Sequence, residues 1–202
     1  MRIGLLGPAD GDAALVRQAA EFLLGKGFVE QVVYLGADDS AEVAGAAWAL
    51  ELMGFAATYE NFLEHAFDLA LGGTPQQIDE LLERDQKLRC VAGLRCLPRA
   101  PARAVELFED KVVLFVHDKA QLDAEDIANS FLVVYGRSKG VALNHFGPRT
   151  FFSPGPLKAG QVAVIERQRD GNLAIAQLSL QSGDVIGRTT LETRRAKMVV
   201  LS

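Results

Sequence analysis

Two basic segments contain the first residues whose types could do chemistry. Between Lys87 and Arg103 there are five basic residues and no acidic one, a local positive field that suits a phosphate group or an acidic partner. Residues 136–140, a Gly-Arg-Ser-Lys-Gly turn, set two cations and a hydroxyl directly after an apolar run. No aromatic residue is interleaved with the cations of the first segment, so we expect no nucleic-acid binding.

The sequence does not contain the common motifs for a metal finger, a phosphate-binding loop or a dinucleotide cofactor. Cys90 and Cys96 lack the spacing of a metal finger and predict two reduced thiols rather than a disulfide. The glycines of residues 136–140 do not follow the phosphate-binding loop pattern, and Gly4 and Gly7 do not complete a dinucleotide fingerprint. We therefore expect neither redox chemistry nor a dinucleotide cofactor.

Length and composition predict one globular domain over residues 1–202, with 49% hydrophobic and 23% charged residues. No apolar run approaches the ~20 residues of a membrane span, and the N-terminus has no signal-peptide pattern, which predicts a cytoplasmic protein without membrane insertion. Charge is uneven: residues 1–85 hold 15 acidic and 4 basic residues, and residues 86–202 hold 11 and 17. We expect the basic residues to face the acidic half.

Hydrophobic periodicity predicts an α/β first half followed by a β-rich second half that pack as a layered sandwich. The expected helices cover residues 14–24, 40–53, 75–82 and 124–130. The expected strands cover residues 3–6, 32–35, 67–71, 105–110, 111–116, 131–135, 141–143, 150–152, 161–167 and 173–180. Residues 86–103 stay ambiguous.

The order of these strand ends resembles the small bacterial and archaeal members of the calcineurin-like metallophosphoesterase family, across almost the whole chain. The resemblance implies an α/β/β/α sandwich of two mixed sheets. In place of the family's Asp-x-His the chain reads Pro8-Ala9-Asp10, in place of Gly-Asp it reads Gly36-Ala37, and in place of Gly-Asn it reads Gly72-Gly73. The family's Thr-His-Gly-His, Gly-His-Thr-His and Asn-Pro-Gly-Ser-Val elements match the runs Val116-His117-Asp118-Lys119, Gly136-Arg137-Ser138-Lys139 and Ser153-Pro154-Gly155-Pro156-Leu157.

The resemblance also implies what has been lost. Active members hold two divalent cations that position a phosphate ester and activate a water. The matching positions here are Pro8, Asp10, Ala37, Gly73, His117, Lys119, Arg137 and Lys139. In the run from Val116 to Lys119 only His117 keeps a ligand type, and the cations Arg137 and Lys139 would repel an incoming metal ion. We therefore expect no metal, no cofactor and a pseudoenzyme that acts as a scaffold or protein-interaction module.

Two other functions remain open at this point. Arg137, Ser138 and Lys139 supply donors for a metal-free site that senses phosphate or a nucleotide. Alternatively, a residual metal-dependent phosphodiesterase would need a rearranged one-metal site, with His117 and the carboxylates Asp10, Asp38, Asp39 and Asp118 as ligands. Against both, we expect Asp10 to pair with Arg137 or Lys139, which would neutralise the cleft, and His117 to be hydrogen-bonded.

Apolar residues in the first half suggest either a docking patch for a partner protein or core packing. They are Trp48, Met53, Phe55, Tyr59 and Phe62. The C-terminal residues 198–202 follow three cations in residues 194–197 and suggest a last strand or an exposed tail. The sequence identifies no particular partner.

Overall fold

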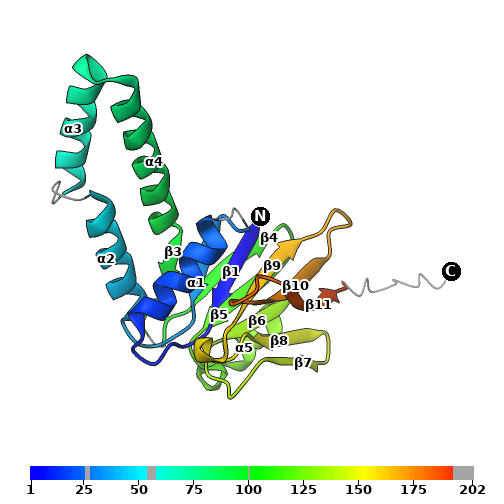
Figure 1. Ribbon diagram of the computed structural model, residues 1–202. Helices are drawn as coiled ribbons and strands as arrows, with labels where there is room; N and C mark the ends of the chain where they lie inside the picture. The colour runs from blue at the N-terminus through cyan, green and yellow to red at the C-terminus, as the bar shows by residue number, and fades with distance from the viewer. Residues whose placement is uncertain (26–27, 54–57, 100, 193–202) are drawn as a thin grey trace.

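Two mixed β-sheets face each other in the computed structural model, which describes residues 1–25, 28–53, 58–99 and 101–192 (Figure 1). The first sheet has the strand order β11 (Val185–Leu191), β10 (Leu173–Ser179), β9 (Gln161–Arg167), β1 (Arg2–Leu6), β2 (Gln31–Tyr34), β3 (Leu94–Cys96). The second has the order β4 (Ala104–Phe108), β5 (Lys111–Val116), β6 (Leu132–Tyr135), β8 (Arg149–Ser153), β7 (Ala142–Phe146).

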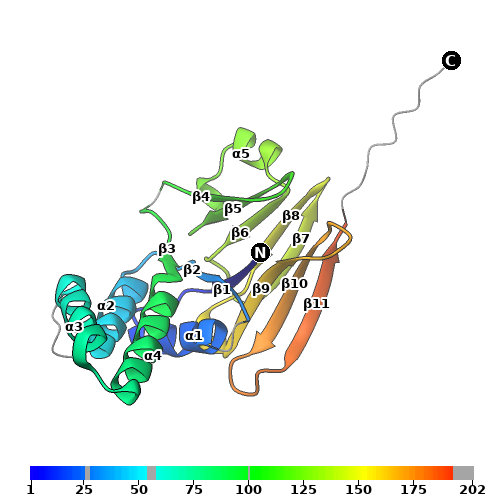
Figure 2. The same ribbon diagram turned by 90° about the horizontal axis from the view of Figure 1, so that it is seen from above.

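Helices cover the outer face of each sheet (Figure 2). Helices α1 (Ala13–Gly25) and α2 (Ser40–Met53) lie on the first sheet, and α5 (Ala124–Asn129) lies on the second. Two short 3₁₀ turns, η1 (Lys119–Gln121) and η2 (Leu157–Ala159), follow β5 and β8. The predicted α/β/β/α sandwich of two mixed sheets is confirmed.

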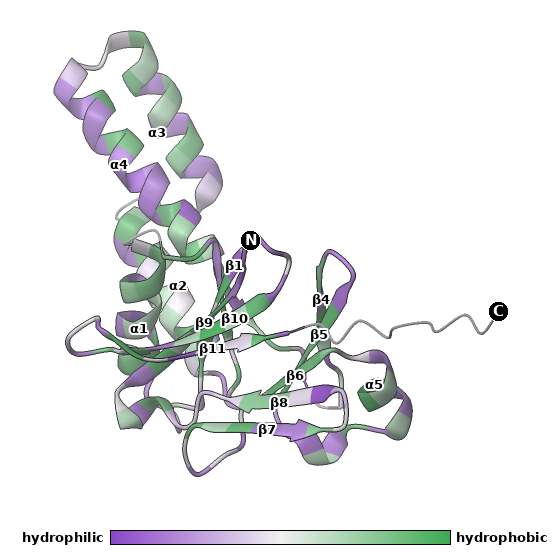
Figure 3. Ribbon diagram, turned by 90° about the vertical axis from the view of Figure 1, so that its right-hand side faces the viewer, coloured by the Kyte–Doolittle hydropathy of each residue, from purple (hydrophilic) through white to green (hydrophobic). Residues whose placement is uncertain are grey.

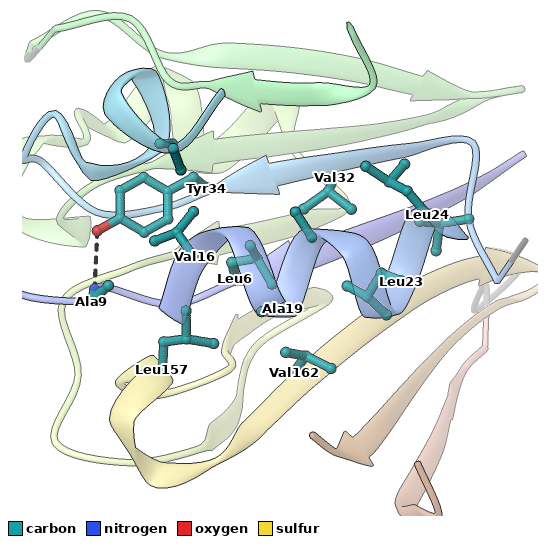
Figure 4. Close-up of a cluster of buried hydrophobic side chains, with 14 of the residues drawn as sticks. Leu6, Ala9, Val16, Ala19, Leu23, Leu24, Val32, Tyr34, Leu157 and Val162 are labelled. Atoms are coloured by element: carbon teal, nitrogen blue, oxygen red, sulfur yellow. Dashed lines mark hydrogen bonds between the residues drawn. The ribbon is translucent and has the colours of Figure 1, made fainter. Parts of the chain in front are cut away.

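Alternation along the strands builds a separate core on each side of the first sheet. On β1, Ile3 and Leu5 pack between the two sheets, where they meet Phe115 and Phe152. Leu6 faces the other way, into the cluster with α1 that Figure 4 shows. Because both faces of β1 are covered, the strand is apolar along most of its length, as a central strand should be.

Helices α3 (Tyr59–Gly72) and α4 (Pro75–Ala92) form a hairpin, here called the helical arm, that rises away from the sandwich (Figure 1). Cys90 and Val91 at the foot of α4 pack against the core under α1 and α2. Thr74 starts α4 with a capping box to Gln77, and Pro75 occupies the first turn. Among the described side chains of the arm, Phe62 alone is buried.

The predicted strand at residues 67–71 is wrong, because these residues belong to α3. Phe67 and Leu71 are exposed on the arm. A short apolar run does not distinguish a strand from a helix segment. The Thr58 side chain caps α3 by accepting a hydrogen bond from the backbone nitrogen of Asn61, at 3.2 Å.

Several other boundaries differ from the prediction. Helix α4 extends beyond residue 82 to Ala92, which resolves part of the ambiguous stretch, and the short β3 follows it. Strand β11 was not predicted.

Phe55 and the C-terminal residues 198–202 lie outside the described residues. Within the described part of the chain, no helix combines the length and apolar character needed to cross a membrane.

Candidate functional site

The ends of four parallel-paired strands enclose a hollow of about 660 Å³, here called the strand-end cleft. Strands β1 and β2 run parallel in one sheet, and β5 and β6 run parallel in the other, so the loops that follow them meet at one end of the sandwich. The cleft is lined by Pro8, Asp10, Leu35, Ala37, Asp38, His117, Asp118, Gln121, Arg137, Ser138 and Pro156.

Backbone contacts between glycines and neighbouring loops set the shape of this end. A Cβ atom added to Gly7 would lie 1.6 Å from the carbonyl oxygen of Gly155, and one added to Gly136 would lie 2.2 Å from that of Leu35. No side chain fits at such distances, because a backbone atom has little room to move. The loops after β1 and β6 are therefore held by direct backbone packing.

Tyr34, at the end of β2, connects the loops after β1 and β2. Its hydroxyl accepts a hydrogen bond from the backbone nitrogen of Ala9 (3.0 Å, Figure 4) and donates one to Asp38 (2.8 Å). Burial raises the pKa of Tyr34 to about 12.

Asp38 is held in place as an acceptor. Its Oδ1 accepts the bond from Tyr34 and a second from the backbone nitrogen of Ser40 (3.0 Å), the first residue of α2. Burial alone would raise the pKa of Asp38, but the hydrogen bonds from Ser40 and Tyr34 outweigh it and keep the pKa below its ordinary value. This oxygen serves the fold rather than an open site.

His117 lines the cleft, and both of its ring nitrogens face main-chain oxygens. Nδ1 lies 3.2 Å from the carbonyl oxygen of Leu35, and Nε2 lies 3.1 Å from that of Pro98. The residue is 8% exposed. A neutral imidazole donates from one nitrogen only, so the lone pair of the other nitrogen faces a carbonyl oxygen, whereas a metal ligand needs that lone pair free. The ring instead bridges the ends of β2 and β3, and the expected hydrogen-bonded role of His117 agrees with these contacts.

Asp118 and Arg137 form an ion pair at the mouth of the cleft. Arg137 donates to Oδ2 of Asp118 at 2.9 Å, and the backbone nitrogen of Ala120 donates to Oδ1, also at 2.9 Å. These hydrogen bonds, led by that from Ala120, lower the pKa of Asp118 despite its partial burial. Arg137 itself is 83% exposed in this pair, so solvent screens the interaction strongly.

The expected pairing of Asp10 with Arg137 or Lys139 is wrong. Asp10 instead lies 3.6 Å from the ammonium nitrogen of Lys158, which belongs to η2. Asp10 adopts a positive φ of 53° directly before Gly11, a left-handed turn that aspartate tolerates. This turn carries the carboxylate toward the loop after β8, a direction that residue spacing alone does not reveal.

Three of the matched positions do not line the cleft. Gly73 lies in the helical arm, because the residues before it form α3 and not the expected strand. Its backbone nitrogen donates a hydrogen bond to the carbonyl oxygen of Leu69 and ends the helix. Lys119 lies over the ring of Tyr135, 5.1 Å from its centroid. Lys139 is exposed outside the lining, and the Ser138 hydroxyl, which does line the cleft, donates to the carbonyl oxygen of Gly140 at 2.6 Å.

The residues at this site do not fit a two-metal centre. Ala37 has no donor atom, Pro8 offers none from its side chain, and Arg137 cannot coordinate a cation. In the part of the chain that the structure describes, no three His, Cys, Asp or Glu side chains are grouped so that they could hold a metal ion. The rearranged one-metal site therefore finds no support in this geometry.

The basic segment of residues 87–103 is largely neutralised by its neighbours. Arg89 pairs with Asp85 at 2.8 Å, Arg95 pairs with Glu106, and Arg103 pairs with Asp126. Among these three cations, the expectation that they face the acidic first half holds for Arg89 and fails for Arg95 and Arg103. Arg95 and Arg103 find their partners in the second half of the chain.

The sequence analysis does not include Tyr34, whose hydroxyl links the two loops that carry Ala9 and Asp38. The signal was a single phenol at the end of an otherwise aliphatic buried strand, since a buried tyrosine hydroxyl nearly always has a hydrogen-bond partner. Pro98, whose carbonyl oxygen meets His117, carries no comparable signal, because the strand before it lies in the stretch of ambiguous periodicity.

Solved structures with this arrangement include phosphoesterase-fold proteins. A conserved uncharacterized protein from Streptococcus pneumoniae, described as a predicted phosphoesterase, is 15% identical, with 94% of this chain and 97% of that chain covered and a TM-score of 0.51. A variant of Vps29 from Entamoeba histolytica is 13% identical over 95% and 100% of the two chains, with a TM-score of 0.49. A novel archaeal phosphodiesterase is 14% identical over 95% and 100%, with a TM-score of 0.42.

No family model and no curated protein matches the sequence. With the strand-end cleft and the likeness to the Streptococcus pneumoniae protein, the chain has the calcineurin-like metallophosphoesterase fold. At this level of identity the likeness defines the fold and leaves the activity open.

Proposed function

We propose that this chain is a pseudoenzyme of the metallophosphoesterase fold that acts as a scaffold through contact with a protein partner. The single observation that carries the proposal is the position of His117, whose two ring nitrogens both face backbone carbonyl oxygens. Catalysis by two metal ions needs several side chains with free lone pairs around one point. Here each ring nitrogen of His117 lies against a backbone carbonyl oxygen.

The carboxylates around the cleft support the same proposal. Asp38 holds the start of α2, Asp118 holds η1 and Arg137, and Asp10 faces Lys158. Asp38 and Asp118 make hydrogen bonds within the fold that a metal ion would have to displace, and Asp10 makes an exposed ion pair. The loops are also fixed by backbone packing, so rearrangement toward a metal centre would require the strand ends to move.

Metal-free sensing of phosphate or a nucleotide has weaker support. Of the three residues expected to bind it, Lys139 lies outside the lining, Ser138 donates to a backbone oxygen, and Arg137 is paired with Asp118. Asp10 and Asp38 add negative charge to the same cleft. An anion entering there would meet more carboxylates than free donors.

Hydrolysis of bis(p-nitrophenyl) phosphate with and without Mn²⁺ tests the loss of catalysis. We expect the same rate with protein and with buffer alone, at every Mn²⁺ concentration. Mn²⁺-dependent turnover that disappears in His117→Ala and persists in His145→Ala would overturn the proposal, since His145 lies on the edge strand β7 away from the cleft.

Thermal unfolding in the presence of inorganic phosphate and a panel of nucleotides tests the sensing alternative. We expect no ligand to raise the melting temperature. A rise that is lost when Arg137→Ala and Lys139→Ala are combined would establish the sensing function instead.

A further inference from the structure

The outer face of α3 carries two rows of side chains that differ in chemistry. Tyr59, Leu63, Phe67 and Leu71 recur every four residues and are 56%, 50%, 65% and 74% exposed. We call them the apolar stripe. Residues four apart lie one above the other on a helix, so the stripe runs for about 18 Å along the helix. Figure 3 shows hydrophobic positions recurring along α3, well clear of the sheets.

The second row, here called the acidic row, is formed by Glu60, Glu64 and Asp68, each one residue after a member of the stripe. Helix α3 has no lysine or arginine. Consecutive residues are ~100° apart on a helix, so the acidic row runs beside the stripe on the side away from the buried Phe62. The face is therefore apolar along one line and negative along the next.

The foot of the stripe opens onto a hollow. Tyr59 lines it together with Met53, Leu88, Val91 and other residues of α2 and α4, and its volume is about 520 Å³. A concave apolar site at the end of an exposed row suits an anchoring side chain from a partner, which is how compact interfaces concentrate their binding energy.

We propose that the stripe and the acidic row bind an amphipathic helix of a partner protein, one whose apolar face is bordered by lysine or arginine. The proposal rests on the proposed role in protein contact and supplies the chemistry of the partner. An apolar helix face would cover the stripe, and its cations would meet the acidic row at the rim, where charge governs specificity and association rate.

Charge disfavours an antiparallel dimer and an anionic membrane at this face. Two copies related by an antiparallel two-fold axis would bring both acidic rows to the same side of the helix pair, where like charges repel. A membrane surface rich in anionic lipid would be repelled by the same carboxylates. An amphipathic helix with basic borders would cover the apolar stripe and pair its cations with the acidic row.

The test uses a fluorescent 18-residue peptide of leucine and lysine, patterned as an amphipathic helix, and a matched peptide with glutamate at every lysine position. We expect saturable binding of the lysine peptide to the full chain by fluorescence anisotropy, weaker at high salt, and no binding of the glutamate peptide. Phe67→Ser with Leu71→Ser should weaken binding about tenfold or more. Glu64→Gln with Asp68→Asn should weaken it less and flatten the salt dependence.

The matched control is Val185→Ser with Ile186→Ser, which removes two exposed apolar residues from β11. It should bind the lysine peptide as the unaltered chain does. Equal binding of both peptides, no binding, or equal loss in the β11 variant would overturn the proposal. So would a dimer in sedimentation, or adsorption to anionic vesicles, that Phe67→Ser abolishes. Failure here would leave the metal and hydrolysis results unchanged, so the two proposals can fail separately.

Discussion

The strand-end cleft and the helical arm are built on opposite principles. In the cleft, glycine backbones pack against neighbouring loops, the Tyr34 hydroxyl both accepts and donates a hydrogen bond, and the ring nitrogens of His117 lie against carbonyl oxygens. In the arm, four large apolar side chains of α3 face solvent. The comparison teaches that the polar groups around the cleft contact one another or the backbone, whereas the arm leaves large apolar side chains exposed. Interaction is therefore expected at the arm.

The largest expected difference between the two regions is in their tolerance of an added methyl group. Gly7→Ala would place a Cβ against the carbonyl oxygen of Gly155 and should destabilise the fold by about 3 kcal/mol or more. Gly72→Ala, at the end of α3 with open space around it, should be neutral or stabilise by up to about 1 kcal/mol. Urea unfolding measures both. Equal free energies of unfolding for the two variants would contradict the account of the cleft.

Tyr34→Phe should have an intermediate effect. It removes the hydroxyl that accepts from Ala9 and leaves that buried nitrogen unpaired, a loss of roughly 1–3 kcal/mol. The folded pKa of about 12 exceeds the ordinary 10.0, so the hydroxyl's contribution is complete below pH 10 and lost as pH rises from 10 to about 12. The stability gap between Tyr34→Phe and the unaltered chain should narrow over that window. A gap that does not change with pH would refute the coupling of this hydroxyl to folding.

Phe67→Ser should have the smallest effect on stability. Its side chain is exposed and contributes little to the core, so the free energy of unfolding should change by no more than about 0.5 kcal/mol. Phe62→Ser, five residues earlier at a buried position, should lower the free energy of unfolding by about 3 kcal/mol or more. Thermal unfolding of the two variants shows which of the two side chains contributes to stability. A large loss in Phe67→Ser would mean that the stripe serves folding.

Much of the fold could be predicted because its elements have clear local signals. Ser40 to Met53 was predicted as a helix with the observed bounds, and the hairpins around residues 147 and 171 follow from their turn glycines. The arm was misjudged because Phe67 to Leu71 is both a short apolar run and part of a row with a spacing of four. Only the longer window, from Tyr59 onward, distinguishes the two periods.

The candidate site was predictable in place but not in its contacts. Residues that follow parallel strands must gather at one edge of a sandwich, so Pro8, Ala37, His117 and Arg137 could be expected together. Which carboxylate each cation would meet depends on loop directions set by distant contacts. Asp10 therefore faces Lys158, and Arg137 faces Asp118, although neither pair is close in sequence.

The measurement that tests the central claim most directly is calorimetric titration of the chelator-treated protein with Mn²⁺. A cleft whose imidazole and carboxylates are engaged within the fold should give no binding heat above dilution. Two sites per chain with micromolar or tighter affinity, lost in His117→Ala, would show that these groups are available to metal ions and would contradict the account.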